Sequence, residues 1–154
     1  MEKVKAIVTV VISAVTSALG ALAIPVLLLV GCNVVDYGTG LFATQFRNEK
    51  ITSYKSIRGI AKKVCMWLLV LIGAWVDILI EYSVEYIGLD FGLHFAVSTI
   101  VAVWLVINEI ISILENMRDI GVTIPPFLLP VMKHLQTTTD NVATIETKEE
   151  KANE

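Results

Sequence analysis

The chain has 154 residues, of which 55% are hydrophobic and only 18% charged; its net charge is -3 and its mean hydropathy is +0.72. An ordinary soluble domain of this size is far less apolar. Because a helix that spans a bilayer uses about 20 apolar residues, the composition predicts an all-α integral membrane protein and leaves no room for a soluble catalytic domain.

The first apolar stretch, residues 6–44, carries one charged side chain, Asp36, and is about twice as long as one span requires. Gly20 and Pro25 bracket its natural break point, because a proline inside a helix removes a hydrogen bond and clashes with the preceding turn. Two further apolar runs follow. We therefore expect four transmembrane helices joined by short loops, at residues 5–22, 25–46, 64–81 and 95–115. Three spans are the alternative, with the first helix interfacial because its Ser and Thr residues lower its hydrophobicity.

The charges between the apolar runs are unevenly distributed. The connection at residues 81–94 is acidic, with Glu81, Glu85 and Asp90 and no basic residue. Residues 45–63 contain a single acidic residue, Glu49, and a basic cluster that consists of Arg47, Lys50, Lys55, Arg58, Lys62 and Lys63. The positive-inside rule places the basic loop in the cytoplasm and the acidic one outside. With four spans, both termini are then cytoplasmic. The basic cluster is also a surface for anionic lipid headgroups, and we expect no nucleic-acid binding.

The C-terminal part has a different character. Gly121 and the pair Pro125 and Pro126 predict a turn, followed by a short interfacial segment at 127–135. Residues 136–154 are polar and acidic, which predicts a disordered cytoplasmic tail. We therefore divide the chain into a helical membrane domain, residues 1–135, and this tail.

Nothing in the sequence predicts an active site. We find no nucleophile paired with a base and no nucleotide motif, and His94 and His134 have no ligand cluster around them. We expect no catalytic residue, metal or cofactor, and no enzyme.

The first helix has a face of small, mildly polar residues, which are Thr9, Ser13, Thr16, Ser17 and Gly20. In lipid, small residues four apart permit helices to approach closely. The face therefore predicts either packing within one copy, or an oligomer seam or a pore-lining surface.

Three carboxylates, Asp36, Asp77 and Glu109, lie in or near the apolar helices. A charged side chain inside a membrane costs several kcal/mol, so it tends to face a partner or water. Asp36 is the best candidate for a functional carboxylate, hydrogen-bonded to Thr39 one turn on. The simplest interpretation of Asp77 is an interfacial carboxylate.

The end of the last apolar helix has a polar stripe, Asn108, Ser112 and Glu115. Such a stripe can bond a neighbouring helix or can be a solvated helix end, and both interpretations remain open.

Four blocks of polar residues resemble one known family. They are Asp36-Tyr37-Gly38-Thr39-Gly40; residues 53–63 with Lys55, Arg58-Gly59-Ile60 and Lys62-Lys63; Asn108-Glu109 with Ser112-Ile113-Leu114-Glu115-Asn116; and Gly121-Val122-Thr123-Ile124-Pro125. Over residues 34–130 the chain resembles the bacteriophage lysis and toxin-secretion holins of clostridia and other Gram-positive hosts. Thr123, where proline is common, and Pro130, in a segment that is usually basic and helical, depart from the family pattern.

The resemblance implies a holin that accumulates in the bacterial cytoplasmic membrane, associates with copies of itself and opens non-specific holes. An endolysin or a secreted toxin is then the indirect partner that escapes. Two other hypotheses come from the residues. Asp36 suits a small ion channel or transporter, and the basic loop with the acidic tail suits a membrane scaffold for a cytoplasmic partner.

Overall fold

The computed structural model describes residues 1–47, 53–88 and 96–150, and this part of the chain is helical without a β-strand. The elements are α1 (Glu2–Leu19), the short 3-10 helix η1 (Gly20–Leu22), α2 (Ala23–Phe46), α3 (Ser53–Tyr86), α4 (Ala96–Ile120) and α5 (Leu128–Glu150). The predicted all-α membrane fold is confirmed.

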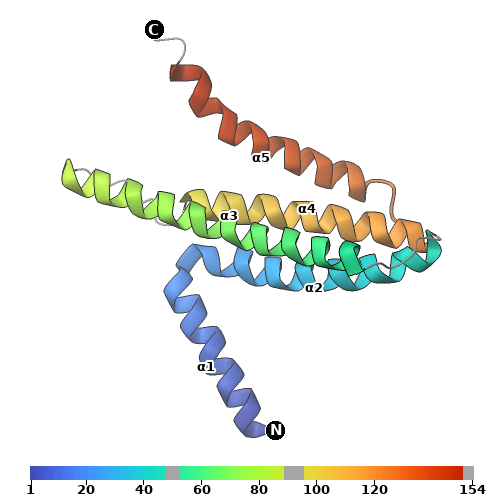
Figure 1. Ribbon diagram of the computed structural model, residues 1–154. Coiled ribbons are helices and arrows are strands. Elements are labelled where there is room, and N and C mark those ends of the chain that lie inside the picture. The colour runs from blue at the N-terminus through green and yellow to red at the C-terminus, as the bar shows by residue number, and fades with distance from the viewer. Residues whose placement is uncertain (48–52, 89–95, 151–154) are drawn as a thin grey trace.

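Three helical segments of the described chain are long and apolar enough to cross a membrane: Gly20–Phe46, Ser56–Tyr86 and Ala96–Ile120. They lie side by side as a bundle in which α4 packs against both α2 and α3 (Figure 1). The described residues thus include three candidate spans, the number of the alternative prediction, and α1 is not among them. A fourth span formed by α1 stays a prediction.

The break between α1 and α2 occurs at Gly20, as the sequence predicts. Gly20 has a φ of +50°, a left-handed conformation that glycine adopts without steric cost. α1 consequently leaves the bundle at a steep angle (Figure 1). Pro25 lies in the first turn of α2, where backbone N–H groups have no partner within the helix, so its missing N–H interrupts nothing.

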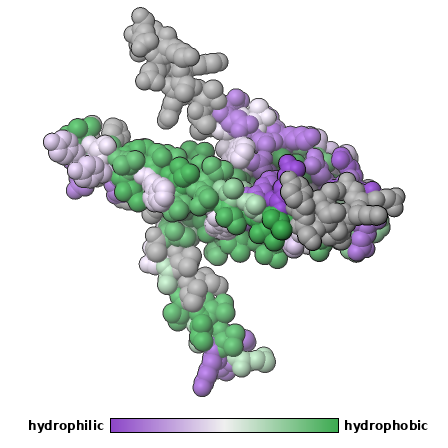
Figure 2. Space-filling view, in the orientation of Figure 1, coloured by the Kyte–Doolittle hydropathy of each residue, from purple (hydrophilic) through white to green (hydrophobic). Residues whose placement is uncertain are grey.

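The bundle is apolar inside and, along most of its length, outside. A buried cluster from α2, α3 and α4 includes Leu29, Val70 and Leu105. Leu28 and Leu68, by contrast, are about half exposed at 53% and 50%, and hydrophobic side chains cover much of the visible bundle surface (Figure 2). Such a surface matches hydrocarbon rather than water.

α3 and α4 approach each other closely at Gly73. A Cβ atom at this position would lie 2.9 Å from the Cα atom of Ser98, which real Cβ atoms essentially never do. Small residues permit such close approach of membrane helices, whose association depends on tight packing. Gly73 therefore sets the distance between the two helices.

Two regions differ from the sequence-based expectations. Residues 53–63, expected as part of a basic loop, form the beginning of α3, because Lys and Arg are good helix formers. Residues 136–150, expected as a disordered tail, continue α5, which packs against α4. Pro130 does not break α5, since it lies in the first turn. The low hydropathy and the charges of residues 136–150 predict poor membrane insertion. A polar segment can nevertheless form a helix that packs against another helix.

We expect Gly73→Ala to destabilise the bundle by about 1–3 kcal/mol, because the added methyl group must push the backbone of Ser98 away. Gly38→Ala is the matched control: nothing lies within 4 Å of its added Cβ, so the better helix propensity of alanine should stabilise the protein slightly. Denaturant unfolding in detergent micelles measures both. Equal stabilisation by the two substitutions would contradict the close approach.

Candidate functional site

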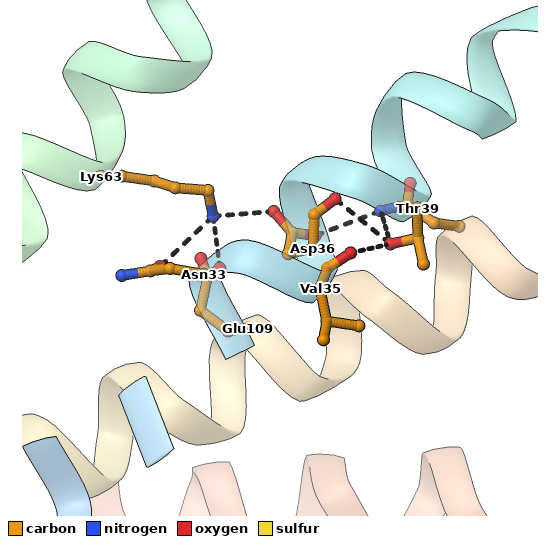
Figure 3. A network of polar contacts seen from close by, with 7 residues as sticks. Asn33, Val35, Asp36, Thr39, Lys63 and Glu109 are labelled. Atoms are coloured by element: carbon orange, nitrogen blue, oxygen red, sulfur yellow. Dashed lines mark hydrogen bonds and ion pairs between the residues drawn. The ribbon is translucent and has the colours of Figure 1, made fainter. Parts of the chain in front are cut away.

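The centre of the site is Lys63, which joins three helices. Its Nζ atom donates hydrogen bonds to Asn33 Oδ1 at 3.3 Å and to Asp36 Oδ2 at 2.9 Å, both on α2. It also forms an ion pair with the Glu109 carboxylate on α4 (Figure 3). Since Lys63 belongs to α3, one ammonium group binds all three helices of the bundle together.

These charged groups are largely removed from solvent. The Glu109 side chain is 1% exposed, and those of Lys63 and Asp36 are 16% and 17% exposed. At about 1.5 Å per residue, Asp36 and Glu109 lie about 15 Å from the ends of their helices at Phe46 and Ile120. Both positions are thus well inside the candidate spans Gly20–Phe46 and Ala96–Ile120. The ammonium is therefore the partner that lets two carboxylates remain there.

The network continues from Asp36 toward the helix ends. Asn116 Nδ2 donates to Asp36 Oδ1 at 3.1 Å and to Thr39 Oγ1 at 3.4 Å. The Oδ1 atom of Asn116 accepts a hydrogen bond from Arg47 at 3.0 Å, and Arg47 Nε donates to Asp119 Oδ2 at 2.6 Å. α2 and α4 are thus joined by polar contacts from mid-helix to their shared end.

The structure changes the expected role of Thr39. Its hydroxyl donates to the backbone carbonyl oxygens of Val35 at 2.9 Å and Asp36 at 3.2 Å, not to the Asp36 carboxylate (Figure 3). A threonine hydroxyl in a helix commonly bonds to a carbonyl one turn earlier. The Asp36 carboxylate instead has Lys63 and Asn116 as partners, which local spacing in the sequence does not reveal.

Asp77 forms a second polar contact on the same bundle. Its carboxylate accepts hydrogen bonds from the backbone N–H groups of Val97 at 2.8 Å and Ser98 at 2.9 Å, and from the Ser98 hydroxyl at 2.6 Å. Asp77 is 6% exposed and Ser98 is fully buried. An anion at a helix N-terminus satisfies free N–H groups and interacts favourably with the helix dipole. Asp77 of α3 therefore caps α4, where the sequence suggested a simple interfacial carboxylate.

The polar stripe of α4 faces two neighbours. Asn108 Oδ1 accepts a hydrogen bond from Gln136 Nε2 of α5 at 2.6 Å. Ser112 and Glu115 line a groove between α3 and α4, to which Lys62 also contributes. The stripe thus bonds a neighbouring helix at Asn108, while its remaining part borders open space.

The other candidate residues lie outside the network. On α1, Thr9, Ser13, Ser17 and Gly20 are exposed, and the side chain of Thr16 lies outside the described part. Of the basic cluster, Arg58 and Lys62 are exposed, Lys50 lies outside the described residues, and so does the side chain of Lys55. Arg47 and Lys63 are the members of this cluster that enter the network.

Sequence reasoning missed Asn33, Ser98 and Asp119 as site residues, and it treated Lys63 as a topology signal, a lipid-facing charge and part of a family motif, not as a partner of buried carboxylates. An amide in a long apolar run is unusual, and this signal could have drawn attention to Asn33. Ser98 and Asp119 carry no such signal, because their partners Asp77 and Arg47 are far away in sequence.

Within residues 1–47, 53–88 and 96–150, no cluster of three His, Cys, Asp or Glu side chains is arranged to hold a metal ion. The described polar groups instead bind one another across helices. The fold and the site together define a small α-helical integral membrane protein with an internal polar network.

The sequence model of the bacteriophage holin family matches residues 13–137, most of the chain. The protein belongs to the bacteriophage holin family, and it is a phage holin-type membrane protein. This family is non-enzymatic, and membership implies oligomerisation in the membrane.

Several curated proteins are similar to the chain. An uncharacterised protein of Clostridium perfringens is 30% identical over 116 residues, which is 75% of this chain and 78% of that protein. Uncharacterised proteins of Halalkalibacterium halodurans and Listeria monocytogenes are 34% and 33% identical over 60% and 62% of this chain. The matches cover 63% and 59% of those two relatives. No solved structure matches the chain.

We expect Lys63→Met to lower the free energy of unfolding in detergent micelles by about 3 kcal/mol, because two buried carboxylates lose their shared cation. Lys62→Met, at the exposed neighbouring position, should change it little. Combining Lys63→Met with Asp36→Asn and Glu109→Gln should restore much of the loss, since no buried charge is then left unpaired. Equal effects of the two single lysine substitutions would disprove the central role of Lys63.

Asp77→Ala should destabilise the protein by about 1–3 kcal/mol, because the N–H groups at the start of α4 lose their acceptor in a buried place. Asp77→Asn should lose less, since asparagine also caps helices. Glu85→Ala, an exposed carboxylate on the same helix, serves as the control. Thermal unfolding in micelles compares the three variants, and an Asp77→Ala protein as stable as Glu85→Ala would rule out the cap.

Proposed function

We propose that this protein is a holin that oligomerises in the bacterial cytoplasmic membrane and opens non-specific holes, through which an endolysin or a toxin leaves the cell. The observation that carries the proposal is the family match over residues 13–137. This range includes all three candidate spans and every residue of the Lys63 network.

The geometry supports this function because the contacts that hold the three-helix bundle together lie within one copy. The Lys63 network pairs one ammonium of α3 with carboxylates of α2 and α4 within one copy, while the outer side chains of these helices are largely apolar (Figure 2). Such a unit is stable in lipid and can accumulate there. Copies can then associate through helix faces, because close packing drives association in lipid.

We assign one contact between copies to the small polar face of α1. Thr9, Ser13 and Ser17 are exposed, and α1 leaves the bundle instead of packing along it (Figure 1). Their small side chains let another helix approach closely. This assignment favours an oligomer seam over packing within one copy.

The topology we propose follows the charges. The bundle end with Arg47, Lys62 and Arg118 is basic and faces the cytoplasm and its anionic lipids, while Glu81 and Glu85 mark the outer end. With α1 as a fourth span, both termini of the single copy are cytoplasmic.

Induced expression in a bacterial host should collapse the membrane potential and release a folded cytoplasmic reporter enzyme. A potential-sensitive dye and reporter activity in the medium measure the two effects. The control is Leu105→Pro: a proline in the middle of α4, at a buried position, breaks the bundle and should abolish both.

Cells that stay energised and retain the reporter at high expression would refute the proposal. A flux limited to particular solutes, lost in Asp36→Asn and without reporter release, would instead indicate an ion channel or transporter.

A further inference from the structure

α5 packs against the candidate span α4 and runs obliquely to it (Figure 1). Two side-chain hydrogen bonds hold it there. Gln136 Nε2 donates to Asn108 Oδ1 at 2.6 Å, and Trp104 Nε1 donates to Asp140 Oδ1 at 2.8 Å. Both partners on α4 belong to the candidate span Ala96–Ile120. The polar helix α5 is therefore docked on a surface that belongs to the interior of the membrane.

The second contact lies deep. Trp104 is about 24 Å from the end of α4 at Ile120, at about 1.5 Å per residue. Trp104 is also about 12 Å from the other end at Ala96, so docking holds Asp140 beside the inner part of the candidate span and not beside either of its ends. Carboxylates and amides at this depth are costly unless they face a protein partner or water.

The two sides of α5 differ in what they contact. Met132, Gln136 and Thr139 recur at helical spacing and are half-buried, so this side faces the bundle. Lys133, Thr137 and Asn141 are exposed and also recur four residues apart. They form a polar outer stripe, and hydrophilic residues are visible along this part of the molecule (Figure 2). Lipid tails provide no hydrogen-bonding partner for the ammonium and amide groups of such a stripe.

We propose that α5 lines the aqueous lumen of the hole, with Lys133, Thr137 and Asn141 facing water. This inference rests on the proposed function, since it names the element that borders the hole. Water can form hydrogen bonds with the exposed stripe while the inner side of α5 stays bound to α4. The lumen that assembled copies enclose supplies this water.

The first test measures which solvent reaches the stripe. Purified full-length protein with Cys32→Ala and Cys65→Ala, which removes its two free thiols, is reconstituted into vesicles of phosphatidylethanolamine and phosphatidylglycerol that contain a fluorescent protein. A spin label is attached at Asn141→Cys or at Leu68→Cys. Leu68 is the matched control because it is an exposed apolar residue next to Leu69, which lines the same hollow as Trp104 and Asp140.

We expect the label at residue 141 to collide mainly with a water-soluble nickel chelate and the label at residue 68 mainly with oxygen dissolved in lipid. The ratio of nickel to oxygen collisions should be several-fold higher at residue 141. A label at residue 141 with the oxygen preference of residue 68 would overturn the proposal. A label reached by neither reagent would also overturn it, and would indicate a second copy covering the stripe.

The second test shows whether α5 is docked while the hole is open, since a cytoplasmic helix would also meet water. In the same cysteine-free background, Val101→Cys and Thr139→Cys, which line the same hollow and leave both docking hydrogen bonds in place, are bridged by a short bis-methanethiosulfonate reagent, which a reductant removes. We expect bridging within one chain in vesicles that have released the fluorescent protein, and bridged protein that still releases it. Failure to bridge in such vesicles, or release that is blocked until the bridge is reduced, would overturn the lumen assignment.

The failure of the holin function itself has a different signature. In that case the vesicles retain the fluorescent protein with the unbridged protein and with both labelled variants. Release by all of them, with a lipid-exposed or undocked α5, refutes the lumen assignment alone.

Discussion

The ion cluster of Lys63 with Asp36 and Glu109 is the interaction on which the rest of the bundle depends. Inside a membrane, helices gain no hydrophobic stabilisation from meeting one another, because lipid is as apolar as leucine. Packing and polar contacts must then decide how they associate. One ammonium shared by carboxylates of α2 and α4 fixes the depth at which all three helices meet. A shift of one helix along another would leave a charge without its partner, which is costly in lipid.

A second constraint at another depth converts this meeting point into a fixed arrangement. Asp77 caps the start of α4, and Gly73 brings α3 against the backbone of Ser98. With polar contacts at both levels, α3 can neither slide along α4 nor turn on it. The apolar side chains between these levels then need only fill space. This arrangement explains how the bundle has a defined structure although its exposed side chains, such as Leu28 and Leu68, are apolar.

The sequence predicts the helices well because their causes are local. Long apolar runs, and a glycine at the break between α1 and α2, are properties of neighbouring residues. The pairing of Lys63 with Asp36 and Glu109 depends instead on how helices distant in sequence align, which hydropathy does not encode. From the sequence, a lysine beside an apolar run is interpreted as a topology signal. In the structure α3 already begins at Ser53, so Lys63 lies within the helix and can face its neighbours. The helix at 136–150 was missed because polar composition was equated with disorder.

One rule of membrane chemistry accounts for both polar features of the molecule: a polar group at depth needs either a partner or water. The Lys63 network supplies partners for its charged groups inside one copy. The Asp140 carboxylate accepts a hydrogen bond from Trp104 on α4. The neighbouring outer stripe of α5, which includes Asn141, is exposed. If α5 remains docked, water is the hydrogen-bonding partner that the polar groups of this stripe require. The network therefore makes the copy stable before assembly, and α5 links assembly to the entry of water.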